Sequence, residues 1–224
     1  MAAPRPNCLL VLSAGNEGVS AQSFIQAYNL ASSNFNIQLA SPGGRNVEYT
    51  QQDESNRRWF NEFRSKASST PIALDTVDAA RYSALLLPSA PGALQDLATD
   101  KHLGQILSHF VNEKKGICAV GLGVAGLCAA RKGDGRTWCF DSYSLTGPSV
   151  FELARSADFP SLSIIIEDFI KDNGGNYNSS EPDAVHIIID RHLITGQNVQ
   201  STLTAVQNLT LMCAPKHAKV MSPR

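Results

Sequence analysis

Short, continuous apolar runs recur along this chain, and a segment with helical periodicity follows most of them. The first run covers Cys8–Ser13, and later ones cover Phe35–Ala40 and Ser83–Leu87. Uninterrupted apolar runs of this length are typical of strands buried on both faces, as in parallel sheets. After the first run, apolar residues at positions 21, 24, 25 and 28 follow the spacing of one helix face. This alternation predicts an α/β fold in which helices cover both faces of a mostly parallel sheet.

The same alternation continues to the C-terminal part of the chain. Leu103–Val111 has the clearest amphipathic helix pattern, and it ends at Gly116. The other expected elements are a strand at Ile117–Val120, a helix at Val124–Ala130, strands at Trp138–Tyr143, Val185–Asp190 and Leu193–Thr195, and a final helix capped by Ser201. We therefore expect a single three-layer sandwich domain over residues 1–215. A polar, cap-like insert at 45–71 and a flexible tail at 216–224 complete the prediction.

Composition narrows the classes of function. The chain has 224 residues, 43% of them hydrophobic, and no apolar stretch approaches the ~18 residues of a membrane span. The formal net charge is −1 and the basic residues are dispersed, so we expect no direct binding to nucleic acid. Five cysteines without zinc-ligand spacing, and no export signal, predict reduced thiols, no metal site and a cytoplasmic protein.

One segment supports two incompatible interpretations. Gly121, Gly123 and Gly126 form a G-x-G-x-x-G pattern between a strand-like and a helix-like run. This pattern is the dinucleotide fingerprint, in which glycines let backbone amides approach a pyrophosphate. Asp141 stands about 20 residues after the first glycine, where a ribose-binding acid is expected. However, at least three strand-like runs precede the motif, whereas a nucleotide-binding unit normally opens its sheet. The alternative is a nucleophile elbow, a sharp strand-to-helix turn, and on this interpretation we expect no cofactor.

Several blocks of the chain resemble the class I glutamine amidotransferase-like superfamily. Residues 40–44 resemble its A-S-P-x-G-G, residues 82–88 its Y-D-A-L-x-x-P, and residues 91–97 its H-G-x-x-x-D-L. Residues 145–149 with Glu152 resemble its T-G-x-S-x-x-E-E, and residues 190–198 its D-G-x-L-I-T-G-Q-N. The match is to the branch with PfpI-type proteases, chaperone-glyoxalases and the Parkinson disease 7 protein. The resemblance spans nearly the whole chain and implies a flavodoxin-like fold.

The chain departs from this family at the elbow. The family pattern there is A-x-C-H-G, with the cysteine as nucleophile. Gly121 occupies the cysteine position, Leu122 the histidine position, and Gly123 the glycine position. Glycine adopts the strained dihedral angles of such a turn freely, but it has no side chain that could react. Leu122 cannot accept a proton or orient a thiolate.

The neighbouring oxyanion loop also differs from the family pattern, P-G-G-H-G. Its central residues are Ser89, Ala90 and Pro91, and Pro91 has no amide proton to donate to an oxyanion. Glu17 matches the family's acidic residue beside the nucleophile, but it has no thiol to act on. The family's catalytic residues therefore cannot be carried over. Cys118 and Cys128, the thiols nearest the elbow in sequence, are expected to be inert and buried.

The polar insert contains three aromatic residues, Trp59, Phe60 and Phe63, on one face of a helix that also carries arginines. Two alternatives follow from this composition. The stripe packs as a cap against its own domain, or it forms a candidate surface for a partner protein, because aromatic residues with arginine are typical of binding hot spots.

These observations predict a non-catalytic protein that acts by protein–protein association, as a subunit of a larger intracellular assembly. The family resemblance implies a homodimer or a higher homo-oligomer. Two alternatives stay open. One is a residual hydrolase or glyoxalase-type enzyme that acts on small carbonyl compounds or amides. The other is a sensor that binds a small ligand in the emptied elbow pocket.

Overall fold

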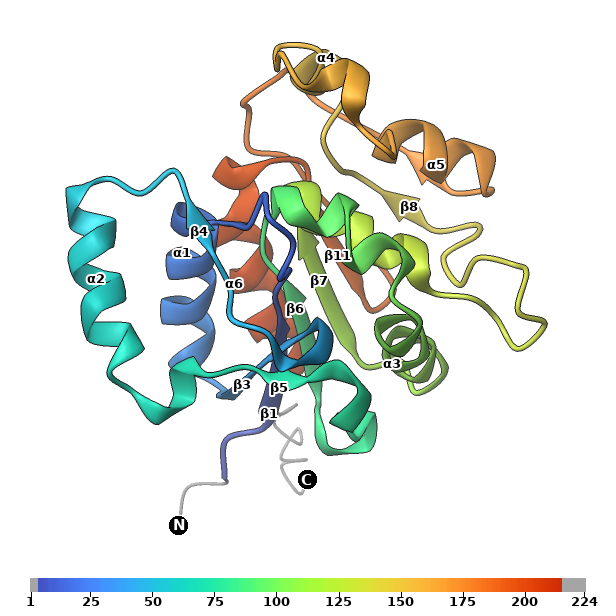
Figure 1. Ribbon diagram of the computed structural model, residues 1–224. Coiled ribbons are helices and arrows are strands. Elements are labelled where there is room, and N and C mark those ends of the chain that lie inside the picture. The colour runs from blue at the N-terminus through green and yellow to red at the C-terminus, as the bar shows by residue number, and fades with distance from the viewer. Residues whose placement is uncertain (1–3, 215–224) are drawn as a thin grey trace, which may run out of the picture.

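A seven-stranded sheet forms the centre of the computed structural model, which describes residues 4–214 (Figure 1). The strand order is β10-β11-β7-β6-β1-β3-β5, and neighbours run parallel except β10, which is antiparallel to β11. The strands are β1 (Asn7–Val11), β3 (Asn36–Ser41), β5 (Ile72–Ala73), β6 (Ala84–Leu87), β7 (Gly116–Val120), β10 (Ile187–Asp190) and β11 (Leu193–Gly196). Two small parallel pairs, β2 (Val19–Ser20) with β4 (Tyr49–Thr50) and β8 (Ser144–Leu145) with β9 (Asn176–Tyr177), lie outside this sheet.

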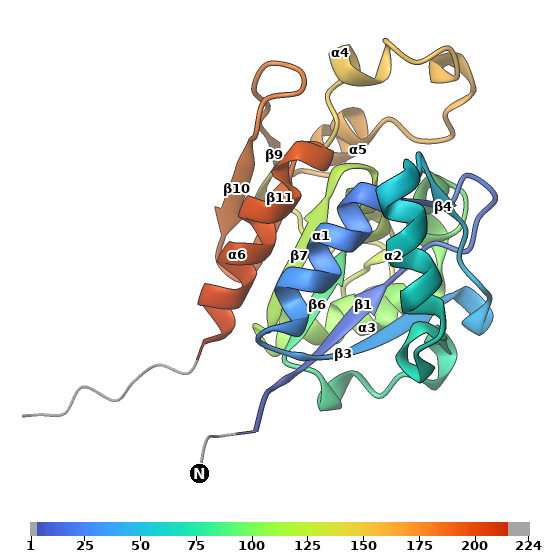
Figure 2. The ribbon, with the colours of Figure 1, turned by 90° about the vertical axis from the view of Figure 1, so that its left-hand side faces the viewer.

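Helices cover both faces of the sheet. α1 (Ala21–Ser32) and α6 (Thr202–Cys213) lie side by side on one face, and α3 (Lys101–Asn112) lies on the other (Figures 1 and 2). The remaining α-helices are α2 (Glu54–Arg64), α4 (Val150–Leu153) and α5 (Ile166–Asp172). The expected three-layer α/β sandwich with a mostly parallel sheet is confirmed. The expected tail at 216–224 lies outside the described residues.

Parallel pairing places the functional loops at one edge of the sheet. β1, β6, β7 and β11 run in the same direction, so the loops that follow them meet at their carboxyl ends. All five residues of β7 and all four of β6 are buried, as their continuous apolar runs predict. The register pairs Leu87 of β6 with Ala119 of β7. Ser89 and Gly121 each lie two residues beyond that pair, and they therefore come together above the sheet.

Two sequence predictions about local structure were wrong. Trp138–Tyr143 is a series of turns, with one isolated bridge between Arg131 and Trp138. Ser142 adopts a φ of +65°, which is incompatible with an extended strand. The apolar side chains of this segment are buried although its backbone forms turns. Trp138 Nε1 donates a hydrogen bond to Leu127 O at 2.8 Å. The helix expected at Val124–Ala130 is instead a 3-10 run, η7, over Gly121–Ala129.

The cap of the last helix also differs in detail. Ser201 is the N-cap residue of α6, as expected, but its side chain makes no capping hydrogen bond there. Its hydroxyl donates to Asn198 Oδ1 at 2.9 Å instead. Asn198 Oδ1 also accepts from Ser201 N and so caps the preceding 3-10 turn, Val199–Ser201. The capping function has moved three residues earlier because the chain enters α6 through this extra turn.

The aromatic insert packs on its own domain. α2 lies outside α1 (Figure 1), and only 1% of Phe60 and 2% of Phe63 is exposed. Both rings contact Phe24 of α1, with centroid distances of 6.0 and 5.4 Å. Trp59 is half-buried and stacks on Phe63 at 4.9 Å. In this structure Phe60 and Phe63 are therefore part of the core and are not accessible to a partner. Their burial agrees with the first alternative, a cap packed on the chain's own domain, and it corrects the expectation that Phe60 and Phe63 form an interaction surface.

Candidate functional site

The elbow, residues 121–123, begins directly after β7. Gly121 has a φ of +53°, a left-handed conformation that glycine adopts without strain. A Cβ atom at this position would lie 2.9 Å from Ser89 Cβ and closer still to Ser89 Oγ. The hydroxymethyl group of Ser89 therefore fills the space that a side chain at the elbow apex would need. The apex lacks a nucleophile, and another residue occupies its place.

Ser89 is held firmly in that position. Its amide donates a hydrogen bond to Ser23 Oγ at 3.0 Å, and its carbonyl accepts one from Ser20 N at 2.9 Å. Both partners lie at the start of α1, and only 5% of Ser89 is exposed. The Ser89 hydroxyl accepts a hydrogen bond from Leu122 N at 3.3 Å. In nucleophile elbows the amide after the apex is an oxyanion donor. Here it is already engaged by Ser89.

The two other glycines of the motif serve close packing. A Cβ atom at Gly123 would lie 2.9 Å from Leu87 O and closer still to Pro88 O. At Gly126 it would lie 3.3 Å from the side chains of Leu103 and Leu87. These approaches are to the protein's own strand and helix, which explains the glycines without a pyrophosphate. Asp141, the candidate ribose ligand, lies in the turn region and pairs with Lys132 at 2.5 Å. The strand that would present it to a ribose is absent from this part of the structure.

The loop after β6 forms one side of the elbow. Ala90 is extended, with φ −144° and ψ 108°, and buried. Pro91 is the first residue of the 3-10 turn Pro91–Leu94. Because proline has no N–H, the first position of this turn contributes no backbone donor. The amide donor that the sequence predicts to be missing from the oxyanion loop is therefore missing at Pro91, which lines the same pocket as Leu122 of the elbow.

Glu17 lies in the exposed turn after β1. Gly18 closes this turn with a φ of +66°, and its amide donates to Gly15 O at 3.0 Å. Asp96 holds the base of the turn, because its carboxylate accepts hydrogen bonds from Ser13 Oγ and Ala14 N, each at 2.8 Å. Glu17 and Leu122 of the elbow line the same pocket, and Gly121 supplies no thiol at the apex.

The five cysteines are poorly exposed to solvent. Cys8, Cys118, Cys128 and Cys139 are buried, and Cys213 is half-buried. Burial raises the pKa of Cys118, and it raises the pKa of Cys128 to about 12. Burial also raises the pKa of Cys213 to about 11. Because the thiolate is the reactive form, these thiols are weak nucleophiles at neutral pH.

An open pocket of about 560 Å³ adjoins the elbow, and we call it the elbow pocket. Leu122 and Pro91 form one side of it, and Glu17 lies on another. The opposite wall comes from α4 and the chain after it, through Leu153 and Leu162. Sequence reasoning located the elbow side of this pocket, but it did not identify the opposite wall.

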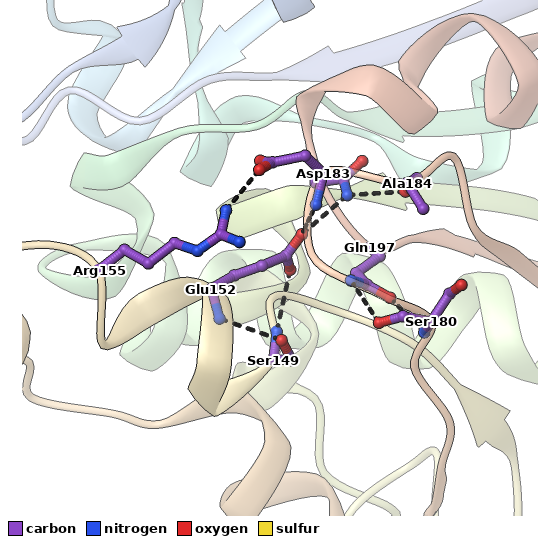
Figure 3. Close-up of polar contacts among 8 residues, drawn as sticks. Ser149, Glu152, Arg155, Ser180, Asp183, Ala184 and Gln197 are labelled. Atoms are coloured by element: carbon purple, nitrogen blue, oxygen red, sulfur yellow. Dashed lines mark hydrogen bonds and ion pairs between the residues drawn. The ribbon is translucent and has the colours of Figure 1, made fainter.

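A polar network holds α4 beside the pocket (Figure 3). Ser149 and Glu152 form a capping box, in which each side chain accepts a hydrogen bond from the other residue's amide. Glu152 Oε1 also accepts from Asp183 N and Asn198 Nδ2, each at 2.9 Å. Arg155 pairs with the Asp183 carboxylate. The two sequence blocks at 145–152 and 190–198 therefore meet in space.

The described part of the chain contains neither of two other kinds of site. Between residues 4 and 214, no three metal-ligating side chains come together. Over the same residues, no helix has the length and apolar character needed to cross a membrane.

Comparisons with known proteins identify the family of the chain. No protein-family model matches it. Glutamine amidotransferase-like class 1 domain-containing protein 1 of Homo sapiens is 56% identical over 95% of this chain and 96% of its own length. The protein of the same name from Danio rerio is 54% identical, over 93% of this chain and 97% of its own length.

Solved structures give the same fold. Glyoxalase III from Candida albicans superposes with a TM-score of 0.83 at 18% identity, covering 92% of this chain and 97% of that one. The Rapid Encystment Protein 24 KDa of Francisella tularensis has a TM-score of 0.83 at 20% identity, covering 94% and 100%. At these identities the structures establish the architecture and not the activity. The sequence relatives go further: the chain belongs to the family of glutamine amidotransferase-like class 1 domain-containing protein 1, within the glutamine amidotransferase-like superfamily.

Proposed function

We propose that this protein is a non-catalytic member of its superfamily. The observation that carries the proposal is the position of Ser89, whose side chain fills the apex space and accepts the hydrogen bond of Leu122 N. A substrate carbonyl would find no nucleophile at Gly121, and the amide that follows is already bonded. The likeness to glyoxalase III concerns the fold alone.

Activity measurements test this proposal directly. Purified protein is expected to show no glyoxalase, amidase or peptidase turnover above background. Gly121→Cys is expected to stay inactive, because the new side chain would collide with Ser89 and Leu122 supplies no base. Wild-type turnover that disappears on changing Cys118, Cys128 or Glu17 would contradict the proposal and favour the enzyme alternative.

We further propose that the protein acts by association with other proteins, as a subunit of an intracellular assembly. The supporting observation is Phe151, which is 80% exposed on α4 although the helix beneath it is fixed by the Glu152 network. Because the backbone beneath Phe151 is already ordered, a partner would need to order only the side chain, and aromatic residues often dominate the binding energy of interfaces. Phe151 thus replaces the α2 aromatics as the candidate anchor.

A pair of matched variants tests the role of Phe151. Phe151→Asp and Leu211→Asp each place a charge at an exposed apolar position, and Leu211, 73% exposed on α6, is the control. Both variants are expected to keep the wild-type unfolding midpoint, because surface substitutions usually change stability by less than about 0.5 kcal/mol. In affinity purification with quantified stoichiometry, Phe151→Asp should lose the stoichiometric partners and Leu211→Asp should retain them. Full retention by Phe151→Asp would refute this surface.

A further inference from the structure

The elbow pocket combines an apolar wall with an acidic rim. Its apolar lining comprises Pro91, Leu94, Leu122, Leu153 and Leu162. At about 560 Å³, it lies within the range of roughly 300–1,000 Å³ that is usual for ligand sites. Such sites are mostly apolar with a few polar groups that fix the ligand's orientation. This pocket is more polar than that, with eight polar residues among the thirteen that line it, but its five apolar residues give the alkyl body of a ligand a surface to pack on.

The charges around the pocket have one sign. Glu17 and Asp158 are the charged residues among the described residues that line it, and both are exposed carboxylates. No lysine, arginine or histidine is present in that lining, and the remaining polar residues are neutral. An anionic ligand would meet repulsion here with no compensating cation, whereas a cationic ligand would be attracted.

The walls of the pocket are preorganised. The Glu17 turn is held at its base by Asp96, through Ser13 Oγ and Ala14 N at 2.8 Å. The wall that includes Leu153 is held through Glu152, which accepts hydrogen bonds from Asp183 N and Asn198 Nδ2 at 2.9 Å (Figure 3). Ser163, farther along the same wall, donates to Leu94 O at 3.1 Å and ties the two sides together. A ligand would therefore not need to order these segments on binding.

We propose that the elbow pocket binds a primary alkylammonium group, with the alkyl chain against the leucine wall and the ammonium at Glu17 and Asp158. A long aliphatic stem with a cationic head satisfies both parts of the pocket at once, as lysine side chains do at apolar surfaces. The group could come from a free alkylamine or from the lysine side chain of a partner protein. This inference goes beyond protein association, because it does not require Phe151 or any assembly.

Titration of the purified full-length protein, followed by ¹H–¹⁵N NMR, tests the pocket. The probes are n-hexylammonium, neutral n-hexanol and anionic hexanoate. Saturable shifts are expected for n-hexylammonium at the amides of Glu17, Leu122 and Ser163, with weaker binding of n-hexanol and none of hexanoate. Raising the salt concentration should weaken n-hexylammonium binding, because the carboxylates are solvent-accessible.

Substitutions of the two acidic residues then test whether their charges bind the ammonium group. The double change Glu17→Gln and Asp158→Asn should raise the Kd for n-hexylammonium roughly fivefold or more, as expected from losing two exposed ion pairs, and leave n-hexanol binding unchanged. Asp75→Asn is the control, an exposed acid on the 3-10 turn Leu74–Thr76 outside the pocket. The proposal is overturned if n-hexanol binds as tightly as n-hexylammonium, if the double variant keeps wild-type affinity, or if shifts do not centre on the elbow.

Two peptide probes distinguish the sources of the ammonium group. One is a blocked tripeptide of leucine, lysine and leucine, and the other carries norleucine in place of lysine. Tighter binding of the lysine peptide than of n-hexylammonium assigns the site to a partner's lysine, and the reverse order assigns it to a free amine. Because these titrations use the isolated protein, their outcome is independent of the Phe151→Asp purification. Either proposal can therefore fail alone.

Discussion

Substituting alanine for the glycine at the elbow apex tests whether Ser89 occupies the missing side chain's space. In Gly121→Ala, the new Cβ would lie 2.9 Å from Ser89 Cβ and nearer to Ser89 Oγ, and the backbone would stay at φ +53°. Left-handed strain costs on the order of 1–3 kcal/mol, and overpacking a well-packed site costs about 1–3 kcal/mol more. We therefore expect the free energy of unfolding to fall by roughly 2–6 kcal/mol.

Two other glycines separate these contributions. Gly133 and Gly135 lie in an exposed turn, and a Cβ atom at either would meet nothing within 4 Å. Gly135 has a φ of +68°, so Gly135→Ala measures the strain alone. Gly133 does not have a left-handed φ, and Gly133→Ala should change stability by less than about 0.5 kcal/mol. The expected order of destabilisation is Gly121, then Gly135, then Gly133.

A double-mutant cycle with Ser89→Gly isolates the contact itself. Ser89→Gly alone should cost about 1 kcal/mol, because the hydrogen bond from Leu122 N is lost. In that background Gly121→Ala should cost only the strain, so the coupling free energy should be about 1–3 kcal/mol. Urea unfolding followed by tryptophan fluorescence supplies each value. If Gly121→Ala costs no more than Gly135→Ala, or if the coupling is zero, Ser89 does not fill the apex.

Three further predictions follow from the described contacts. Thiol reagents should modify the native protein slowly and react first with half-buried Cys213. Because the pKa of Cys213 is raised to about 11, the rate of its modification should increase as the pH rises from 7 toward 11. Combined alanine substitution of Trp59, Phe60 and Phe63 should unfold the protein. Each buried Phe→Ala change costs about 3–5 kcal/mol, whereas the whole free energy of unfolding of a domain is typically about 5–15 kcal/mol. A variant that stays folded by circular dichroism would contradict the packing of α2. NAD and NADP should bind no better than unrelated nucleotides in calorimetry, and saturable micromolar binding abolished by Asp141→Ala would overturn the elbow interpretation.

The sequence alone determined the architecture and the position of the elbow. Continuous apolar runs such as Ile117–Val120 predict buried parallel strands because both faces of such strands contact helices. Gly121, Leu122 and Pro91 could be recognised as departures from a reactive turn because the family resemblance aligns them with positions whose chemical groups they lack. These are properties of single residues and of local periodicity, which a linear pattern contains.

Tertiary structure decided which residues meet. Ser89 lies against Gly121 only because β6 pairs with β7 in the register that joins Leu87 to Ala119. A glycine at the apex beside a larger residue in the oxyanion loop was a visible signal, but its meaning depended on that register. The aromatic residues of α2 could be assigned to the core only from their contacts with α1, because an apolar stripe on a helix does not show whether its own domain or a partner protein packs against it. The local periodicity of apolar residues predicts which side chains are buried. It does not predict which strands and helices pack against one another, because that depends on how the chain connects them in three dimensions.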